Sequence, residues 1–217
     1  HGISARYGQS TDAVSRSMVH ARLAGDERLI ARNATGLSSS TLLGPTPVPQ
    51  AIELCEQLIA NGLGDRQAES KILCTLAQLR AMNGQIDTAR ALCRRGRGLL
   101  RELGQGLNAA STGIDMLLVE LLAGDLIAAE REVKDDYEFL TRAGETYYLS
   151  TMAALLSRVV RDQGRDDEAL VYSEIAEATA ADDDMESQAL WRSIRAPIVA
   201  RAGNLSEAES LARSAVE

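Results

Sequence analysis

The sequence predicts an all-α protein, a solenoid of about 11 helices that pair as antiparallel hairpins. A glycine followed five residues later by an alanine recurs at intervals of about 40 residues. Hydrophobic residues make up 45% of the chain but aromatic residues only 3%, which favours helices packed closely through Leu, Ala, Ile and Val. Between the glycines, apolar residues recur at helical spacing. The pairs are Gly8/Ala13, Gly84/Ala89, Gly124/Ala129, Gly164/Ala169 and Gly203/Ala208, with Gly44 in the same series.

The first two helices are expected over residues 10–24 and from Asp26 onward. Residues 10–12 (Ser-Thr-Asp) are candidate caps for the first helix, which ends before Gly25. Asp26 is the candidate cap of the second, in which Gly36 is a weak point. Three prolines in residues 45–49 then predict a stiff loop in place of a glycine turn, rather than a proline-rich ligand motif. Pro49 suits the first turn of the helix that follows.

A regular hairpin is predicted over residues 66–103. The first helix, residues 68–82, ends at an Asn-Gly turn, and Asp87 then lies in the first turn of the second helix, over residues 85–103. That second helix is amphipathic, with apolar residues on one side and a basic outer stripe on the other. We take the stripe as a candidate docking surface for another domain, with a solvated helix face as the alternative. Its members are Arg90, Arg94, Arg97 and Arg101.

The remaining helices are expected over residues 108–123, 126–142, 145–162, 165–180 and 185–202. Three consecutive aspartates, residues 182–184, are read as a capping loop, because the rest of a calcium-loop pattern is missing. The last of these helices contains Pro197 in its interior, which should kink it at a cost of about 3 kcal/mol unless packing compensates.

Composition and charge exclude several function classes. The net charge of -8 argues against direct nucleic-acid binding, although residues 66–101 carry eight basic and two acidic side chains and residues 120–190 carry eighteen acidic and six basic ones. We find no apolar run close to a membrane span and no signal peptide, and expect a cytoplasmic chain. The chain begins at His1 and stops at Glu217 inside a helical pattern, so we expect a fragment of a longer protein.

The chain also lacks the residues that catalysis would need. Cys55, Cys74 and Cys93 are odd in number, form no CxxC pair and lie on apolar helix faces, so we expect buried core residues. With only two histidines, a His/Cys metal site is not expected, and no cofactor is. The sequence contains no phosphate loop of the GxxxxGK[ST] form and no GxSxG motif. We therefore expect no enzymatic activity from this chain.

The glycine-to-alanine spacing has a structural reason. The glycine ends one helix in a left-handed conformation, and the alanine lets the next helix approach closely. This pattern resembles the tetratricopeptide repeat (TPR), with the closing alanine kept at Ala176 and Ala215 and replaced by Gly96 and Asp136. The resemblance implies one TPR-like array, a right-handed superhelical solenoid with a period near 40 and no terminal proline. Its units are 1–25, 26–62, 66–103, 105–143, 145–181 and 184–217.

Longer blocks carry a second resemblance. Most of residues 26–217 is similar to the C-terminal TPR-like region of bacterial class III adenylate/guanylate cyclase proteins, in which a cyclase domain precedes an AAA-type or STAND-type ATPase module and then helical repeats. This implies a regulatory region for an attached cyclase or ATPase. Pro197 departs from that family. The blocks are residues 43–56 (LGPTPVPQAIELCE), 118–125 (LVELLAGD), 148–156 (YLSTMAALL) and 186–192 (ESQALWR).

The TPR resemblance also places the candidate binding residues. It puts first helices on the concave groove, where basic and small polar side chains could hold an acidic peptide tail or an anionic small molecule. Expected partners are protein or peptide segments, including other domains of the same polypeptide. The alternatives are a solvated face and a groove for a small inducer, as in STAND/LuxR-type transcription regulators. The nominated residues are Lys71, Gln78, Ser111, Thr151, Arg158, Arg161, Ser193 and Arg201.

Overall fold

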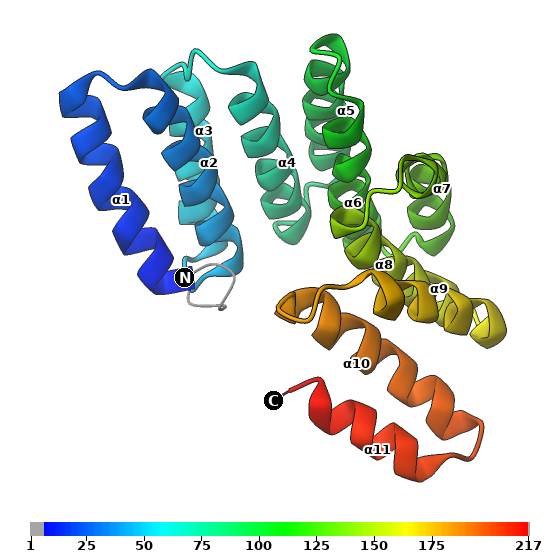
Figure 1. Cartoon of the computed structure of the whole chain (residues 1–217). Coiled ribbons are helices and arrows are strands. Elements are labelled where there is room, and N and C mark those ends of the chain that lie inside the picture. Colours follow the sequence, from blue (N-terminus) through cyan, green and yellow to red (C-terminus); the bar gives the residue numbers. More distant parts are fainter. Residues whose placement is uncertain (1–6, 217) are drawn as a thin grey trace. The chain divides into compact units, whose positions relative to one another are not determined.

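A computed structural model describes residues 7–216 (Figure 1). This range is all-helical, as predicted, with eleven helices and no strand. The helices are α1 (Tyr7–Ala24), α2 (Glu27–Leu43), α3 (Val48–Ala60), α4 (Arg66–Met82), α5 (Ile86–Glu102), α6 (Gly106–Ala123), α7 (Leu126–Ala143), α8 (Tyr147–Asp162), α9 (Asp166–Thr179), α10 (Met185–Arg201) and α11 (Leu205–Ser214).

Side-chain caps start several of these helices. The predicted cap Asp26 accepts a hydrogen bond from the Leu29 amide at 3.0 Å, and Asp184, the last of the three aspartates, accepts one from the Ser187 amide at 3.1 Å. These carboxylates satisfy amide groups that have no partner inside the helix. The prediction for residues 10–12 was wrong, because α1 already begins at Tyr7 and those residues lie inside it. There the packing of α1 on α2 outweighs the capping preference of Ser, Thr and Asp.

The turn glycines recur every 20 residues, half the interval of about 40 residues at which the glycine-to-alanine pairs recur in the sequence. Glycines with φ between 63° and 82° occur every 20 residues, at Gly64, Gly84, Gly104, Gly124, Gly144 and Gly164. They close the turn inside each hairpin and also the turn between hairpins. Two members of the predicted series are not turns of this kind, since Gly8 lies within α1 and Gly44 has φ -97° in the proline-containing loop. Pro49 lies in the first turn of α3, as predicted.

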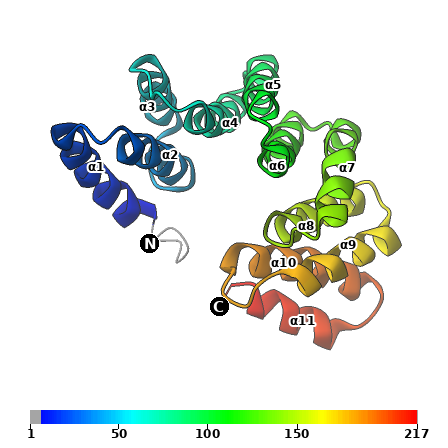
Figure 2. The same cartoon turned by 45° about the horizontal axis from the view of Figure 1, so that its top comes forward.

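The chain packs as two compact units, with the division between Asp115 and Met116 inside α6. In the first unit, α4 packs beside α5 and contacts both α2 and α3, while α1 packs on α2 (Figure 2). A cluster of buried aliphatic residues joins these helices, including Ile52, Leu58, Ile72 and Leu79. Each unit is therefore built from neighbouring helices, as expected for repeats. The single array over residues 1–217, with its six units, stays a prediction.

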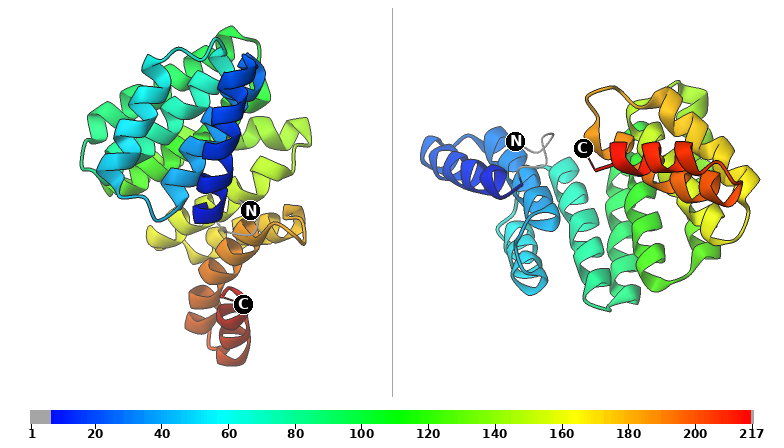
Figure 3. Two further views of the ribbon diagram at one scale, coloured as in Figure 1. Left: turned by 90° about the vertical axis from the view of Figure 1, so that its left-hand side faces the viewer. Right: turned by 90° about the horizontal axis from the view of Figure 1, so that it is seen from below.

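In the second unit, α8 pairs with α9 and α10 pairs with α11, as the colours of Figure 3 allow the reader to follow. Helix α10 lies against both α8 and α9. There Trp191 and Ile194 pack on Ala154 and Ala176. Helix α10 continues through Pro197 to Arg201, so the proline does not end the helix.

The three cysteines are free and buried, which confirms that they are core residues. Burial raises the pKa of the Cys55 thiol to about 12. A hydrogen bond with Cys93, together with burial, raises the pKa of Cys74. These thiols are therefore poor nucleophiles, because the reactive form is the thiolate.

Helix α6 corrects the expectation that no apolar run approaches the length of a membrane span. Residues 106–123 are long and apolar enough, by length and composition, to cross a membrane. Core helices of other proteins pass the same test, and Leu117 and Val119 of α6 are fully buried.

Two glycines of α5 provide a test of the packing. A Cβ added at Gly96 would lie 2.9 Å from the Ser70 carbonyl oxygen and 3.0 Å from Cys74 Sγ, whereas one at Gly98 would meet no atom within 4 Å. We expect Gly96→Ala to lower the free energy of unfolding by about 1–3 kcal/mol through overpacking. We expect Gly98→Ala to raise it by about 0.5–1 kcal/mol, because alanine favours the helix. Urea denaturation of both variants measures the contrast, and equal effects would contradict the close approach of α4 and α5.

Candidate functional site

Three of the nominated groove residues lie in the first unit. Lys71 is exposed on α4. Gln78, also on α4, donates from Nε2 to Asp115 Oδ1 on α6 at 2.6 Å, while Ser111 Oγ donates to the Asn108 carbonyl within α6 at 2.8 Å. Lys71 is thus available to a ligand, whereas Gln78 joins the first helices of two successive hairpins.

Asp115 is a polar residue that the sequence reasoning did not select. Burial raises the pKa of its carboxyl to about 6, against the hydrogen bond from Gln78 and the nearby Arg97 guanidinium, which both lower it. The signal in the sequence was an acidic residue inside the apolar run of residues 113–119. The carboxyl therefore changes charge near neutral pH at the contact between α4 and α6.

Two nominated hydroxyl residues lie in the second unit. Thr151 Oγ1 lies 2.9 Å from Ser187 Oγ, which is also 3.1 Å from Ser150 Oγ. These three hydroxyls join α8 to α10. Ser193 is exposed and donates to the Leu190 carbonyl one turn earlier in α10, at 2.8 Å.

The three nominated arginines of the second unit make ion pairs. Arg201 binds Asp166 with two hydrogen bonds, of 2.8 Å from Nε and 2.6 Å from Nη2, which lower the pKa of that carboxyl. Arg161 binds Asp162 at 2.7 Å and also reaches the Ile194 carbonyl at 3.5 Å. Arg158 lies 3.8 Å from Asp162 and is half exposed. Arg158 therefore has the longest ion-pair distance of the three, while its side chain is about as exposed as that of Arg201.

The four arginines of α5 do not share one environment. Arg94 and Arg101 are exposed, and Arg90 lies 3.5 Å from Asp87. Arg97 donates from Nε to Thr112 Oγ1 on α6 at 3.0 Å. Arg97 thus turns toward the next helix instead of the outer face, so the exposed part of the stripe is shorter than the spacing predicts.

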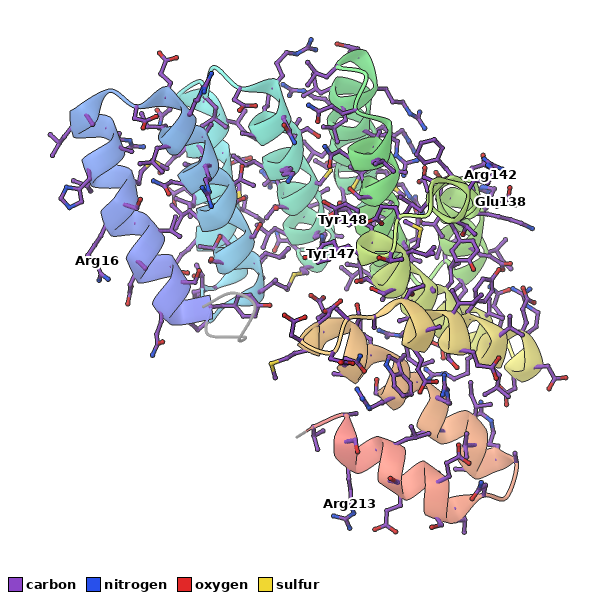
Figure 4. The ribbon with its side chains drawn as sticks, in the orientation of Figure 1. Arg16, Glu138, Arg142, Tyr147, Tyr148 and Arg213 are labelled. Carbon is purple, nitrogen blue, oxygen red and sulfur yellow. The ribbon has the colours of Figure 1, made fainter. Side chains whose placement is uncertain are left out.

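An aromatic pair marks the start of α8. Tyr147 is 69% exposed, and its ring meets that of Tyr148 edge to face at 5.1 Å (Figure 4). Glu145 fixes this end of the helix by accepting hydrogen bonds from both tyrosine amides, at 3.0 and 2.8 Å. Exposed tyrosines are common anchors of protein interfaces. In a chain with five tyrosines, two adjacent ones were the available signal.

Comparison with known proteins identifies similar folds among solved structures. No protein-family model and no curated protein sequence matches the chain. The crystal structure of BtubC (BKLC) from P. vanneervenii is similar with a TM-score of 0.68 and 16% identity, over 97% of this chain and 89% of that one. A Podosopora anserina protein named for kinesin light chain, with nearly identical TPR-like repeats, has a TM-score of 0.59 and 18% identity, over 87% and 93%. The fold is that of the TPR-like helical-repeat proteins.

The described residues 7–216 contain no group of three or more His, Cys, Asp or Glu side chains that could hold a metal ion. The chemistry that the described side chains offer is hydrogen bonding, ion pairing and apolar contact.

The pKa of Asp115 predicts a pH dependence of stability. Its folded-state value of about 6 lies above the ordinary 3.8, so its stabilising contribution is complete below about pH 4 and is lost as the pH rises through 6. We expect Asp115→Asn to abolish that decline and to be more stable than the parent at pH 7.5, by at most about 3 kcal/mol. Thermal unfolding between pH 4 and 8 measures it, with the exposed Asp135→Asn as control. A parent profile that is flat over this range would contradict the assignment.

Proposed function

We propose that this chain is a non-catalytic protein-interaction region that binds peptide or protein segments along the exposed faces of its first helices. The TPR-like repeat fold carries this proposal. Lys71 and Arg158 support it, because they present accessible positive charge on first helices. Such groups suit an acidic segment of a partner, since rim charges guide association and select partners.

In its more specific form, the proposal assigns this region to the regulation of an attached cyclase or ATPase module in the cytoplasm. The segments that it binds would then include other domains of the same polypeptide. Support comes from the four sequence blocks that resemble the repeat region of class III cyclase proteins. The aromatic pair at the start of α8 offers a second contact for such a neighbour.

The alternative proposal is that the region senses a small inducer, as part of a STAND/LuxR-type transcription regulator. A hollow of about 280 Å³ between α1, α2 and α3 supports it. Its walls are largely apolar, with Leu37, Leu54 and Leu58, while Arg22 and Asn61 provide polar groups. An apolar lining with a few polar groups is the usual character of a small-molecule site.

A peptide selection tests the first proposal. We expect acidic peptides to be enriched from a random display library on the immobilised chain. Lys71→Glu or Arg158→Glu should weaken the best peptides roughly threefold to tenfold, because an attractive charge becomes repulsive. The matched controls are Arg94→Glu and Arg101→Glu on α5, measured by fluorescence anisotropy. If the controls weaken binding and the α4 and α8 variants do not, the α5 surface is the docking site instead.

A thermal-shift screen tests the alternative. A metabolite that occupies the hollow at 100 times its Kd should add about 2.7 kcal/mol to the free energy of unfolding and raise the Tm accordingly. Leu54→Trp, which fills the hollow, should remove the shift, while Leu43→Trp at an exposed position should keep it. A shift that survives Leu54→Trp would place the ligand elsewhere.

A further inference from the structure

Two helical stripes form the side walls of the hollow of about 280 Å³ between α1, α2 and α3. Helix α1 contributes four residues at positions i, i+3, i+4 and i+7, and α3 with its C-cap contributes four at the same spacing. Residues at this spacing share one helix face, which is about 10 Å long over seven residues. The stripes are Ser15, Met18, Val19 and Arg22 on α1, and Leu54, Gln57, Leu58 and Asn61 on α3.

The two stripes run in the same direction, because α1 and α3 are each antiparallel to α2 (Figure 1). Arg22 and Asn61, the last residues of their stripes, therefore lie toward the same end of the hollow. Between the stripes the hollow is lined by the buried Met18, Leu37 and Leu58. The result is a short apolar channel with one polar end, on the side of α1 that faces the helices after it.

The polar end offers a cation and amide groups. Arg22 is the one charged residue of the lining, and its exposed guanidinium makes no ion pair within the described residues 7–216. A guanidinium presents a fork of N–H donors that matches a carboxylate. The side-chain amide of Asn61 can donate to the same group. A single unpaired cation balances one negative charge, so this end suits a monoanion.

The apolar wall of α3 departs from the pattern of the other second helices. In the register of 40 residues, the position of Leu54 is occupied by Arg94 on α5, Lys134 on α7 and Glu174 on α9, all of them exposed. Leu54 instead is half-buried and packs against the core. The outward face of a helix is ordinarily polar, so a leucine at this position favours a ligand with an apolar part.

We propose that the hollow between α1, α2 and α3 binds an amphiphilic monocarboxylate with one unbranched apolar tail. The carboxylate pairs with Arg22, and the tail lies between Val19 and Leu54. Burial of the tail drives binding, while the charge at one end orients the ligand. The inference rests on the alternative proposal above, that the region senses a small molecule in this hollow, and it names the chemical class of that molecule.

Octanoate is the probe, titrated at neutral pH into the isotope-labelled chain and followed by the amide shifts of α1 and α3 in NMR spectra. We expect saturable shifts in both helices. Octanol keeps the tail but lacks the charge, so it should bind at least threefold more weakly. Hexanoate has two methylene groups fewer, so it should bind roughly tenfold more weakly.

Variants of the lining assign the two ends of the ligand. Arg22→Gln should weaken octanoate at least threefold and leave octanol unchanged, because only the carboxylate needs the cation. Val19→Glu, at an exposed lining position, should weaken octanoate at least tenfold by repulsion and by lost apolar contact. The matched control is Arg16→Gln, which removes an exposed cation of α1 outside the lining (Figure 4) and should bind like the parent.

The possible failures separate this inference from the proposal on which it rests. If octanol binds as tightly as octanoate, or if Arg22→Gln leaves the affinity for octanoate unchanged, the carboxylate is overturned and the small-molecule proposal stands. If neither compound saturates up to about 10 mM, the amphiphile is overturned, and the metabolite screen decides the wider proposal. If octanoate binding survives both Val19→Glu and Leu54→Trp, the hollow is not the site and both proposals are overturned.

Discussion

The left-handed glycine turn is the constraint on which the rest of the structure depends. A non-glycine residue there costs roughly 1–2 kcal/mol, so the conformation is tied to residue type. With such a glycine every 20 residues from Gly64 to Gly164, the five helices between them, α4 to α8, have 16 to 18 residues each. This fixed length brings the same position of each hairpin, such as Ala89, Ala129 and Ala169, to a fully buried contact. Close packing with few aromatic residues follows from that register.

Polar side chains also join the helices, through hydrogen bonds that alanine side chains cannot make. Three hydrogen-bonded pairs connect different helices of neighbouring hairpins, and the two residues of each pair are 35 to 37 positions apart. The pairs are Gln78 with Asp115, Thr151 with Ser187, and Arg201 with Asp166. A repeat fold depends on such contacts between neighbours, since it has no long-range core. Several of the polar residues nominated for a groove therefore hold adjacent helices together. The cations that stay accessible, Lys71 and Arg158, make no hydrogen bond to another helix within the described residues 7–216.

Three features could be predicted from the sequence, because each depends on local residue type. They are the helical secondary structure, the Asp26 cap, and the hairpin turns at Gly84, Gly124, Gly164 and Gly203. The start of α1 was not, since the packing of α1 on α2 extends the helix past the Ser-Thr-Asp cap signal. Gly144 was missed because a leucine, Leu149, follows five residues later, whereas Gly104 was missed although Ala109 stands at that spacing. For the candidate site, the TPR resemblance nominated the accessible Lys71 and Arg158. Helical spacing selected the arginines of α5 but could not show that Arg97 reaches Thr112, because that depends on where α6 lies.

The same register places residues of successive hairpins at equivalent positions, where their chemistry can be compared. Positions that meet a following helix carry hydrogen-bonding residues within each unit, such as Arg97 in the first and Glu177 in the second. In the last hairpin the equivalent position is Val216, and Pro197 stands where Gln78 and Arg158 stand in earlier hairpins. These replacements keep the shape of the surface and remove its polar partners.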